Sequence, residues 1–510
     1  MLSKTYSYGI SGLDAYPITI EVDISRGLPS IAIVGLPDNA IKESKERVRS
    51  AIKNSGYRFE PSRITINLSP ADTKKEGPSF DLAIALGILA ANGSIDAPEL
   101  NNYVILGELS LDGQIMPIHG ALSVALQASK ENFKGIVLPS INATEAALAN
   151  CINIYPAKNL QDVVYFLQDQ NSIQPLKVEP ALFSTKQSSH DIDFSDVKGQ
   201  TFAKRGLEIA ASGGHNVLLI GPPGSGKSML AKRLSTILPD MTFEEAIETT
   251  KIHSVAGILK PNHAIMINRP FRSPHHTTSD VAVVGGGSFP KPGEVTLSHN
   301  GILFLDELPE FNRDVLEALR QPLEDHYVTI SRATKTLRFP SQFMLVAAMN
   351  PCLCGWYTDP KRECTCSSFQ IQKYLSKISG PLLDRIDLHL EVPAVHSLEL
   401  LSQTKAENSK DIKERTSAAR LIQTKRFLDS PIKSNAFMSQ KQIKEFCALD
   451  SESQKLLKMA IDDLCLSARA HDKILKIART IADLDHKETI LTDHLAEAIQ
   501  YRSLDRNWWG

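Results

Sequence analysis

Hydrophobic residues in the first third of the chain occur in short runs that alternate with longer segments of helical periodicity. The runs ITIEVDI, SIAIVGL, ITINL, YVILGEL and GIVLP are rich in β-branched residues and predict strands. The segment DNAIKESKERVRSAIKNSG predicts a helix, which Asp38 can cap and Gly56 can end. Within it, Ile41, Val48 and Ile52 recur at roughly helical spacing. The alternation predicts an α/β domain.

The same pattern divides the whole chain into regions. Residues 1–170 form the predicted α/β domain, and residues 171–192, with prolines, serines and little periodicity, predict a linker. Residues 193–395 contain the apolar runs NVLLI, GILFL and FMLVAAM and predict a second α/β domain. Residues 396–510 predict a helical domain, as in KILKIARTIADL and LTDHLAEAIQ.

Composition narrows the class of protein. A chain of 510 residues suggests about three domains, and its net charge of −2 excludes a globally basic protein. A nucleic-acid partner would therefore need positive charge that is concentrated locally. The N-terminus has no apolar core of a secretory signal, and the longest apolar run, LAIALGILAA, is too short to span a bilayer. We expect a cytoplasmic protein with no membrane partner.

A glycine-rich loop between a predicted strand and a predicted helix fits the P-loop pattern of nucleotide-binding proteins. Backbone N–H groups of such a loop cradle phosphates, so ATP is the expected ligand. Lys227 would reach the β- and γ-phosphates, and Ser228 would hold Mg²⁺. The loop consists of Gly221, Pro222, Pro223, Gly224, Ser225, Gly226, Lys227 and Ser228.

Two further predicted strands end in polar residues suited to ATP hydrolysis. The strand GILFL is followed by Asp306, a candidate Mg²⁺ ligand, and Glu307, which would polarise the attacking water. The strand FMLVAAM ends at Asn350, which can orient water or the γ-phosphate. Arg385 and Arg469 are candidates for stabilising the transferred phosphate, and each can alternatively form a structural ion pair.

The segment EDHYVTISRATKTLRFPSQF predicts a hairpin with Ala333-Thr334-Lys335 at its turn. Arg332, Lys335 and Arg338 are candidates for contacts with the phosphates of DNA. A solvated hairpin edge protected by basic residues remains the alternative. The nearby segment FRSPHHTTSD favours a loop that contacts DNA or another subunit over a metal site, because its two histidines lack a neighbouring carboxylate or cysteine pair.

Four of the seven cysteines lie close together as two C-x-C pairs separated by nine residues. Four thiolates suit tetrahedral Zn²⁺, although C-x-C is tighter than the usual spacing of zinc ligands. The cluster argues against a disulfide scaffold, and the alternative to zinc is a group of reduced thiols packed in a loop. The four residues are Cys352, Cys354, Cys364 and Cys366.

Several long strings resemble the magnesium-chelatase-like AAA+ proteins of the YifB/ComM type. They are VKGQTFAKRGLEIAASGGHNVLLIGPPGSGKS, RPFRSPHHTTSDVAVVGGGS, HNGILFLDELPEF, AAMNPCLCGWY and SGPLLDRIDLHLEVP. The resemblance covers almost the whole chain. It implies a Lon-protease-like (ribosomal S5 domain 2-like) N-terminal domain, an AAA+ P-loop core and a helical C-terminal lid. It also implies a homo-hexamer in which the Walker A, Walker B, sensor 1, arginine-finger and sensor 2 residues are Lys227 and Ser228, Asp306 and Glu307, Asn350, Arg385, and Arg469.

The segment KEGPSFDLAIALGIL resembles the one that carries the nucleophile of Lon proteases, with Ser79 in its place. A Lon nucleophile is activated by a lysine shortly after a Pro-Ile-Gly-Gly turn. In the matching turn here, Pro117 to Gly120, alignment without gaps puts Leu122 at the lysine position. Lys130 lies too far along the predicted helix to replace it. The domain is therefore predicted to have the Lon-type fold without proteolysis.

For the ComM branch, the resemblance implies an ATP-dependent motor that acts on single-stranded and branched DNA. Such a motor would drive branch migration in homologous recombination during natural transformation, with recombination proteins as further partners. A chaperone-like ATPase that remodels a protein complex is the first alternative, and an ATP-dependent protease is the second.

Overall fold

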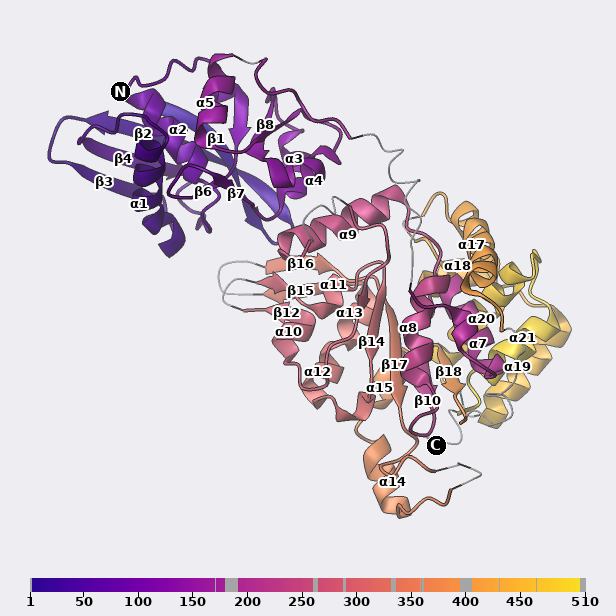
Figure 1. Ribbon diagram of the computed structural model, residues 1–510. Coiled ribbons are helices and arrows are strands. Elements are labelled where there is room, and N and C mark those ends of the chain that lie inside the picture. Colours follow the sequence, from indigo (N-terminus) through magenta and orange to yellow (C-terminus); the bar gives the residue numbers. More distant parts are fainter. Residues whose placement is uncertain are drawn as a thin grey trace. The chain divides into compact units, whose positions relative to one another are not determined.

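Two β-sheets organise the chain, and each lies at the centre of its own unit in the computed structural model (Figure 1). Unit 1 comprises residues 1–187 and 243–267, and unit 2 comprises residues 188–242 and 268–510. The structure describes residues 2–169, 171–178, 191–259, 265–287, 290–331, 336–357, 359, 362–394, 406–430, 432–464 and 466–504.

The sheet of unit 1 has seven strands in the order β3-β4-β2-β1-β5-β8-β9. Strands β1 and β2 form an antiparallel hairpin, β2 pairs antiparallel with β4, and the remaining pairs are parallel. A short separate hairpin is formed by β6 and β7. The strands are β1 (Leu2–Ser11), β2 (Asp14–Ser25), β3 (Ser30–Val34), β4 (Arg63–Ser69), β5 (Tyr103–Ile105), β6 (Glu108–Leu109), β7 (Ile115–Met116), β8 (Gly135–Pro139) and β9 (Ile154–Ala157).

The strand and helix predictions for this region are largely confirmed. Helix α1 (Asn39–Asn54) begins at Asp38, whose side chain accepts a hydrogen bond from the Ile41 N–H at 2.8 Å. Strand β1 is not evident from the sequence. Its residues, LSKTYSYGIS, are mostly polar, and buried and exposed positions do not alternate regularly along it. The run YVILGEL forms two short strands that pair with different partners, since β5 pairs with β8 and β6 pairs with β7.

Helix α2 (Asp81–Ala91) lies at the centre of unit 1 and carries the longest apolar run of the sequence. All its residues but one are buried, and a helix that is apolar on every side is typical of a protein core. The other helices of the unit are α3 (Ala121–Ala128), α4 (Ala143–Ala147), α5 (Leu160–Gln168) and α9 (Phe243–Val255).

Helix α9 belongs to unit 1, although its residues fall inside the region from 193 to 395 that the apolar pattern indicates as one α/β domain. The hydroxyl of Ser254 donates a hydrogen bond to the buried carboxylate of Glu145. The Leu122 N–H donates to the same carboxylate oxygen at 2.9 Å, and the Gly120 N–H donates to the Ser254 hydroxyl at 3.0 Å. Buried hydrogen bonds therefore anchor this helix to the turn before α3.

The sheet of unit 2 is entirely parallel, with the strand order β11-β14-β17-β10-β18. Strand β10 lies between β17 and β18, and both of these strands come later in the sequence. The strand order of the sheet therefore reverses at β10. In such sheets ligands bind at the carboxyl ends of the strands, beside the reversal. The strands are β10 (Val217–Ile220), β11 (Phe271–Arg272), β14 (Ile302–Leu305), β17 (Met344–Met349) and β18 (Leu388–Glu391).

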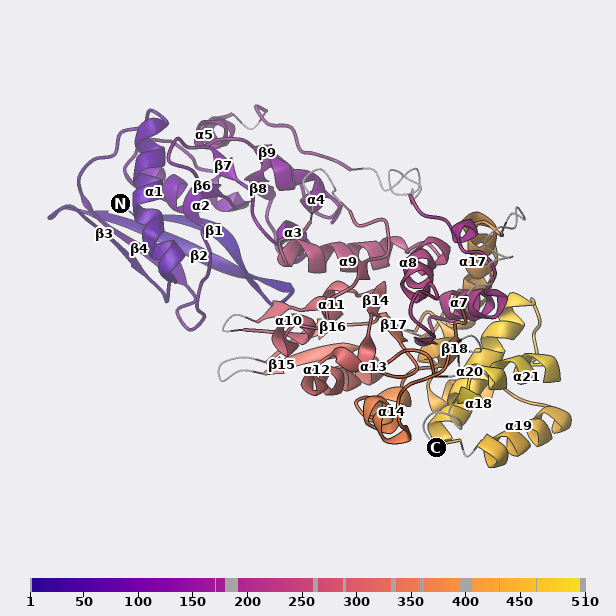
Figure 2. The ribbon, with the colours of Figure 1, turned by 60° about the horizontal axis from the view of Figure 1, so that its bottom comes forward.

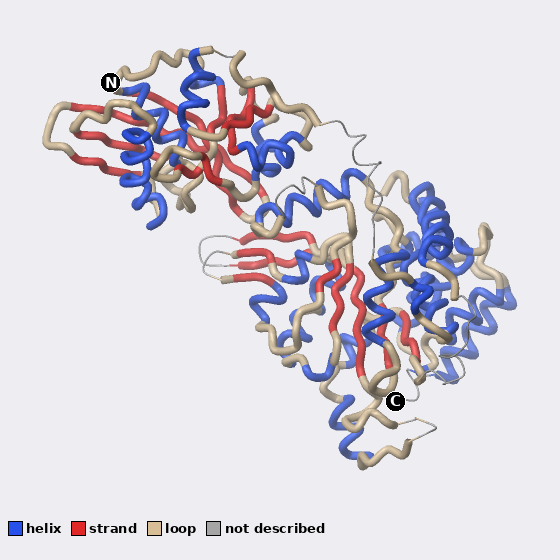
Figure 3. The backbone as a smooth tube through the Cα atoms, in the orientation of Figure 1, coloured by secondary structure: helices blue, strands red, loops and turns tan. Residues whose placement is uncertain are grey.

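The helices of unit 2 cover this sheet and extend beyond it (Figure 3). Those of the first part are α7 (Thr201–Gly213), α8 (Lys227–Ile237), α10 (Asp280–Val284), α11 (Glu294–Leu297), α12 (Arg313–Ala318), α13 (Arg320–Asp325), α14 (Ser368–Leu375) and α15 (Gly380–Leu383). The C-terminal ones are α17 (Ser409–Arg426), α18 (Gln440–Phe446), α19 (Ser451–Leu464), α20 (Ala468–Leu484) and α21 (Thr492–Gln500).

The C-terminal helices share one hydrophobic core with the sheet of unit 2, which confirms the helical prediction for this region. Helix α20 packs against α7, and Figure 2 shows the group beside β18. A buried charge network reinforces the packing, because Arg426 of α17 and Arg479 of α20 both bond to the carboxylate of Asp483. In the part of the chain that the structure describes, no helix is both long and apolar enough to cross a lipid bilayer.

Candidate nucleotide site

The glycine-rich loop joins the carboxyl end of β10 to the N-terminus of α8, as the pattern predicts. Gly226 precedes the helix with a φ of 91°, which side-chain-bearing residues rarely adopt. A Cβ on Gly221 would lie 2.1 Å from the Val392 carbonyl oxygen, so this position has no room for a side chain. The helix N-terminus and the loop N–H groups together form a site suited to phosphate.

Lys227 is the buried cation of this loop. Its ammonium donates to the carbonyl oxygens of Gly221 at 2.7 Å and Pro222 at 2.9 Å, and to Asn350 Oδ1 at 3.1 Å. Burial lowers the pKa of Lys227 to about 8, although the nearby Asp306 carboxylate opposes the shift. The structure therefore brings the predicted phosphate-binding lysine and the predicted sensor residue Asn350 into direct contact.

Ser228 and Asp306 form the candidate magnesium site. The Ser228 hydroxyl donates to Asp306 Oδ2 at 2.6 Å. Magnesium prefers hard oxygen ligands and commonly takes one or two from the protein, and this hydroxyl and carboxylate fit that requirement. The pair forms because β10 and β14 end at the same edge of the sheet on either side of β17.

Glu307 follows Asp306 and directs its carboxylate to solvent, with 59% of the side chain exposed. Its backbone has a φ of 53°, an uncommon value for a residue with a side chain, which is typical of functional positions. The imidazole Nδ1 of His276 lies 3.5 Å from Glu307 Oε2. The sequence predicts an interaction loop at this histidine, and nothing local in the sequence links it to Glu307.

Arg385 and Arg469 meet at a third residue, Glu324. The Arg385 guanidinium donates to one carboxylate oxygen of Glu324, and Arg469 Nη2 donates to the other at 3.2 Å. Arg385 is 11% exposed, whereas Arg469 is 53% exposed. The two predicted phosphate-stabilising arginines therefore lie together within unit 2, joined by a carboxylate that the sequence gave no reason to single out.

The four clustered cysteines bring their sulfur atoms together directly after β17. Cys352 Sγ lies 3.3 Å from Cys354 Sγ and 3.6 Å from Cys364 Sγ, and the four candidate ligand atoms lie within 4.8 Å of one another. Ligands about 2.3 Å from a tetrahedral Zn²⁺ are separated by about 3.8 Å, so the arrangement fits zinc. Cys366 completes the cluster, and its sulfur accepts a hydrogen bond from the Cys354 N–H.

The predicted basic hairpin is present as β15 (Tyr327–Ser331) and β16 (Thr336–Pro340), paired antiparallel. Arg338 is exposed, and its guanidinium lies 4.7 Å from the centre of the Tyr327 ring. Arg332 and Lys335 lie outside the described residues. A second short pair, β12 (Gly285–Gly286) with β13 (Lys291–Pro292), lies beside this hairpin (Figure 1).

Comparisons with known proteins identify the family. Residues 193–400 match the family "Magnesium chelatase, subunit ChlI", and residues 20–142 and 406–502 match the families "Subunit ChlI of Mg-chelatase" and "Magnesium chelatase, subunit ChlI C-terminal". The chain is 45% identical to the uncharacterized protein YifB of Escherichia coli over 507 residues, which is 99% of this chain and 98% of that protein. This chain belongs to the YifB/ComM family of magnesium-chelatase-like AAA+ proteins.

A second full-length relative is the competence protein ComM of Haemophilus influenzae, 45% identical over 508 residues, with 99% of this chain and 98% of that protein covered. The N-terminal region is also similar to Lon protease 2 of Thermus thermophilus, with 26% identity over 135 residues, or 25% of this chain and 16% of that protein. The Lon-like N-terminal domain and the AAA+ domain of the YifB/ComM family are thus both present in this chain.

The Lon-like region of this chain has Leu122 at the position where a Lon protease has its base lysine. Leu122 in α3 is fully buried, and Lys130 bonds to the side chain of Gln127 at 3.0 Å. Lys75, nearer in sequence to Ser79, is buried and donates to the Pro70 carbonyl oxygen. Desolvation lowers the pKa of Lys75, but its ammonium is already bonded to the main chain.

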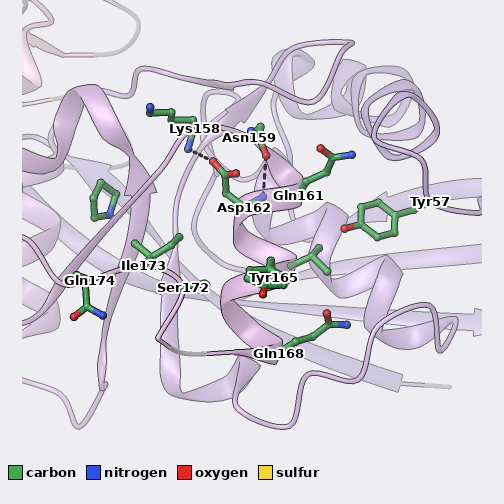
Figure 4. Close-up of a pocket in the computed structure, with 12 residues that line it drawn as sticks. Tyr57, Lys158, Asn159, Gln161, Asp162, Tyr165, Gln168, Ser172, Ile173 and Gln174 are labelled. Atoms are coloured by element: carbon green, nitrogen blue, oxygen red, sulfur yellow. Dashed lines mark hydrogen bonds between the residues drawn. The ribbon is translucent and has the colours of Figure 1, made fainter.

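A surface pocket in unit 1 offers no comparable chemistry (Figure 4). Its polar groups around the start of α5 bond one another, because Asn159 Oδ1 accepts from the Asp162 N–H at 2.8 Å and Asp162 Oδ2 accepts from the Lys158 N–H at 3.2 Å. Its lining contains neither cysteine, serine paired with a base, nor a cluster of carboxylates. Among the described residues, the clustered polar groups suited to phosphate chemistry lie at the carboxyl edge of the unit 2 sheet.

Proposed function

We propose that this protein is an ATP-hydrolysing ring motor that acts on DNA. The observation that carries the ATPase proposal is the Ser228–Asp306 contact beside the P-loop, with Lys227 and Asn350 in contact across the same edge. Because hydrolysis of ATP depends chiefly on positioning and charge stabilisation, a loop, a metal-ligand pair and a nearby carboxylate are the parts that it requires.

Each residue has a distinct role in the proposed hydrolysis. Lys227 neutralises charge on the β- and γ-phosphates, and Ser228 and Asp306 hold Mg²⁺. Bound magnesium supplies further neutralisation of phosphate oxygens. Glu307 orients and polarises the attacking water, and Asn350 contacts the γ-phosphate or that water. Arg385 and Arg469 stabilise charge on the transferred phosphate, with Arg385 acting on the nucleotide of a neighbouring subunit in a homo-hexamer.

DNA is the proposed substrate of the motor. The support is the relative that is named a competence protein, together with the basic hairpin β15–β16 and its exposed Arg338. We propose that Arg332, Lys335 and Arg338 grip the phosphates of single-stranded or branched DNA, and that the motor drives branch migration in homologous recombination during natural transformation. This work would take place in the cytoplasm, with recombination proteins as partners.

Steady-state ATP hydrolysis with and without single-stranded and four-way-junction DNA tests this proposal. Severalfold stimulation by DNA is expected, and Glu307→Gln should abolish it together with the basal rate. Lys335→Ala and Arg338→Ala should reduce stimulation and leave the basal rate intact. Lys458→Ala, at an exposed lysine of α19, is the matched control that should behave like the unaltered protein.

The second candidate is a chaperone-like ATPase that remodels a protein complex. It is favoured by the match of three segments to families of a magnesium chelatase subunit. A remodeller of proteins should ignore DNA, so active hydrolysis that no DNA changes, in protein shown to be assembled, would contradict the motor and favour this candidate.

A structural zinc ion is proposed at Cys352, Cys354, Cys364 and Cys366. The sulfur separations of 3.3 to 3.6 Å support it. Metal analysis of the purified protein should find one zinc per chain, whereas a metal-free, fully reduced and folded protein would contradict the proposal.

A further inference from the structure

Two residues of opposite charge lie largely buried between helix α20 and the segment that leads into β18. The Lys473 ammonium of α20 lies 2.7 Å from Asp387 Oδ1, and the two side chains are 14% and 11% exposed. Burying two charges is costly, and replacing such a pair with apolar residues often makes a protein more stable. A role in geometry therefore explains an ion pair at this position better than a role in stability.

Both members of the pair are ionised near neutral pH. Burial raises the pKa of Asp387, but the charge of Lys473 and the contact with His215 outweigh it and hold this pKa well below its usual range. Burial lowers the pKa of Lys473 to about 8, and Asp387 opposes the shift. His215 Nδ1 lies 3.6 Å from Asp387 Oδ2, and burial lowers the pKa of this histidine, so it faces the pair as a neutral ring.

The carboxylate side of the pair is fixed to the sheet and to the backbone of Arg385. Asp387 Oδ2 accepts from the Asn216 N–H at 2.9 Å, and Asn216 Nδ2 donates to the Arg385 carbonyl oxygen at 3.0 Å. Asn216 precedes β10, and its Oδ1 accepts from the Leu345 N–H of β17 at 2.8 Å. The candidate arginine finger is thus tied through two residues to the central strands of the sheet.

The ammonium side of the pair belongs to a helix that meets the same segment at more than one point. The Ser467 hydroxyl, which caps α20, donates to Asp384 Oδ1 at 3.4 Å. Arg469 and Lys473 are at positions i and i+4 of α20, so their side chains lie on the same face of the helix. The first turns of α20 therefore lie along residues 384–387, which include Arg385.

We propose that the Asp387–Lys473 ion pair positions Arg385 by holding residues 384–387 against α20, which makes both members of the pair positioning residues. Stabilisation of charge on a transferred phosphate depends on placement, and a displacement of about 1 Å can cost about a hundredfold in rate. Loss of the pair would let the segment shift away from the helix and carry the guanidinium with it. The inference rests on the proposed function, in which Arg385 acts on the nucleotide of a neighbouring subunit.

Steady-state ATP hydrolysis by assembled Lys473→Met and Asp387→Asn tests the proposal, with Lys476→Met as the matched control. Lys476 is a second partly buried lysine of α20, and its ammonium donates to the Ala436 carbonyl oxygen at 2.8 Å. The first two variants should lower kcat about tenfold or more. Their affinity for a fluorescent ATP analogue should stay within about twofold, because each subunit keeps its own P-loop. The control should keep the kcat of the unaltered protein.

The double variant that combines Asp387→Asn with Lys473→Met separates positioning from stability. Each single change leaves one charge buried without its partner, so the melting temperature should fall, and it should rise again in the double variant. A pair that served stability alone would regain kcat together with the melting temperature. We expect kcat to stay as low as in the single variants, because the link to α20 is still missing.

Mixed assemblies identify the residue through which the pair acts. Mixtures of Lys473→Met with Glu307→Gln should hydrolyse ATP faster than either variant alone, because intact Arg385 of one subunit then meets intact Glu307 of its neighbour. Mixtures of Lys473→Met with Arg385→Ala should show no such gain, since both variants are defective in the same element.

The contrary results are equally specific. A kcat in Lys473→Met and Asp387→Asn equal to that of Lys476→Met, or a kcat that recovers in the double variant, excludes a positioning role. A gain with Arg385→Ala but none with Glu307→Gln shows that the pair does not act through Arg385. If mixtures of Arg385→Ala with Glu307→Gln stay inactive, the proposed action of Arg385 on a neighbouring nucleotide fails, whereas kcat of the double variant still decides whether the pair has a positioning role.

Discussion

The burial of Lys227 makes its charge, and with it the binding of nucleotide, depend on pH. Burial disfavours the ammonium and lowers its pKa to about 8, so in the nucleotide-free protein the lysine is charged below this pH and neutral above it. A triphosphate favours the charged form. Binding of ATP must therefore be coupled to uptake of a proton when the pH exceeds the pKa of the free site.

We predict that ATP affinity falls as pH rises above about 8, by up to about tenfold per pH unit. Titration calorimetry at alkaline pH in two buffers of different ionisation enthalpy should show uptake of about one proton for each ATP bound. In Lys227→Met the affinity should be low at every pH, without proton uptake from this group. An ATP affinity that is constant across this range in the unaltered protein would contradict the prediction.

The surroundings of Ser79 decide whether it can act as a protease nucleophile. It is half-buried just before α2, and its carbonyl oxygen accepts from the Gly107 N–H at 2.9 Å. Leu122, just after the turn before α3, stands where Lon proteases have the base lysine, and the Gly120 N–H in that turn donates to the Ser254 hydroxyl of α9. The region that would hold a proteolytic base is therefore used for packing.

We predict that Ser79→Ala leaves ATP hydrolysis within a factor of two or so of the unaltered protein and that neither protein degrades casein. The reason is that Leu122 stands where Lon proteases have the base lysine, and the ammonium of Lys75 is bonded to the Pro70 carbonyl oxygen. The measurement is release of acid-soluble peptide in the presence of ATP. Degradation of casein by the unaltered protein, abolished in Ser79→Ala, would instead revive the protease reading.

At the scale of elements, the cysteine loop packs directly against the P-loop. Gly355 has a φ of 83°, and a Cβ on it would lie 2.5 Å from Pro223 Cδ. The cysteine loop begins immediately after Asn350, the sensor candidate at the end of β17. Asn350 in turn contacts Lys227 of the phosphate-binding loop. Anything that displaces the cysteine loop should therefore disturb nucleotide binding.

We predict that Gly355→Ala weakens ATP binding severalfold while zinc content is kept, because the new methyl group forces Pro223 to shift. Binding of a fluorescent ATP analogue measures the effect. Gly56→Ala is the matched control, since Gly56 has a φ of 85° but nothing within 4 Å of an added Cβ. Equal ATP affinity in Gly355→Ala and the control would show that the contact with Pro223 has no influence.

For the whole molecule, the pairing of Arg385 and Arg469 with the same residue, Glu324, is relevant to how subunits would contact each other. Two guanidinium groups meet one carboxylate on a partly exposed surface of unit 2. Such a surface is suited to the triphosphate of a neighbouring subunit. Arg385, Arg469 and Glu324 come from well-separated parts of the chain, so the pairing depends on the complete fold of this unit.

We predict that Arg385→Ala and Glu307→Gln each abolish most hydrolysis, by about a thousandfold for the arginine. Mixed assemblies of the two variants should regain activity. In an equal mixture, about a quarter of subunit interfaces would combine an intact Glu307 with an intact neighbouring Arg385. Steady-state hydrolysis against mixing ratio measures this, and mixtures no more active than either variant alone would indicate that both residues serve the same subunit's nucleotide.

Several features could be predicted from the sequence because they depend on neighbouring residues. The P-loop, the strands that end at Asp306 and Asn350, helix α1 and the hairpin β15–β16 follow from hydrophobic periodicity and loop chemistry within short windows. Strand β1 was missed because its pairing with β2, and not its own apolar pattern, makes it a strand.

The family, the two α/β regions and the prediction of a P-loop all follow from the sequence, since each is encoded in a local pattern. Three other features are visible in the folded chain alone: α9 packs in unit 1, His276 lies beside Glu307, and Arg385 and Arg469 share Glu324. These contacts join segments that are distant in the chain. They depend on strand order and helix packing, which the periodicity of a single segment does not specify.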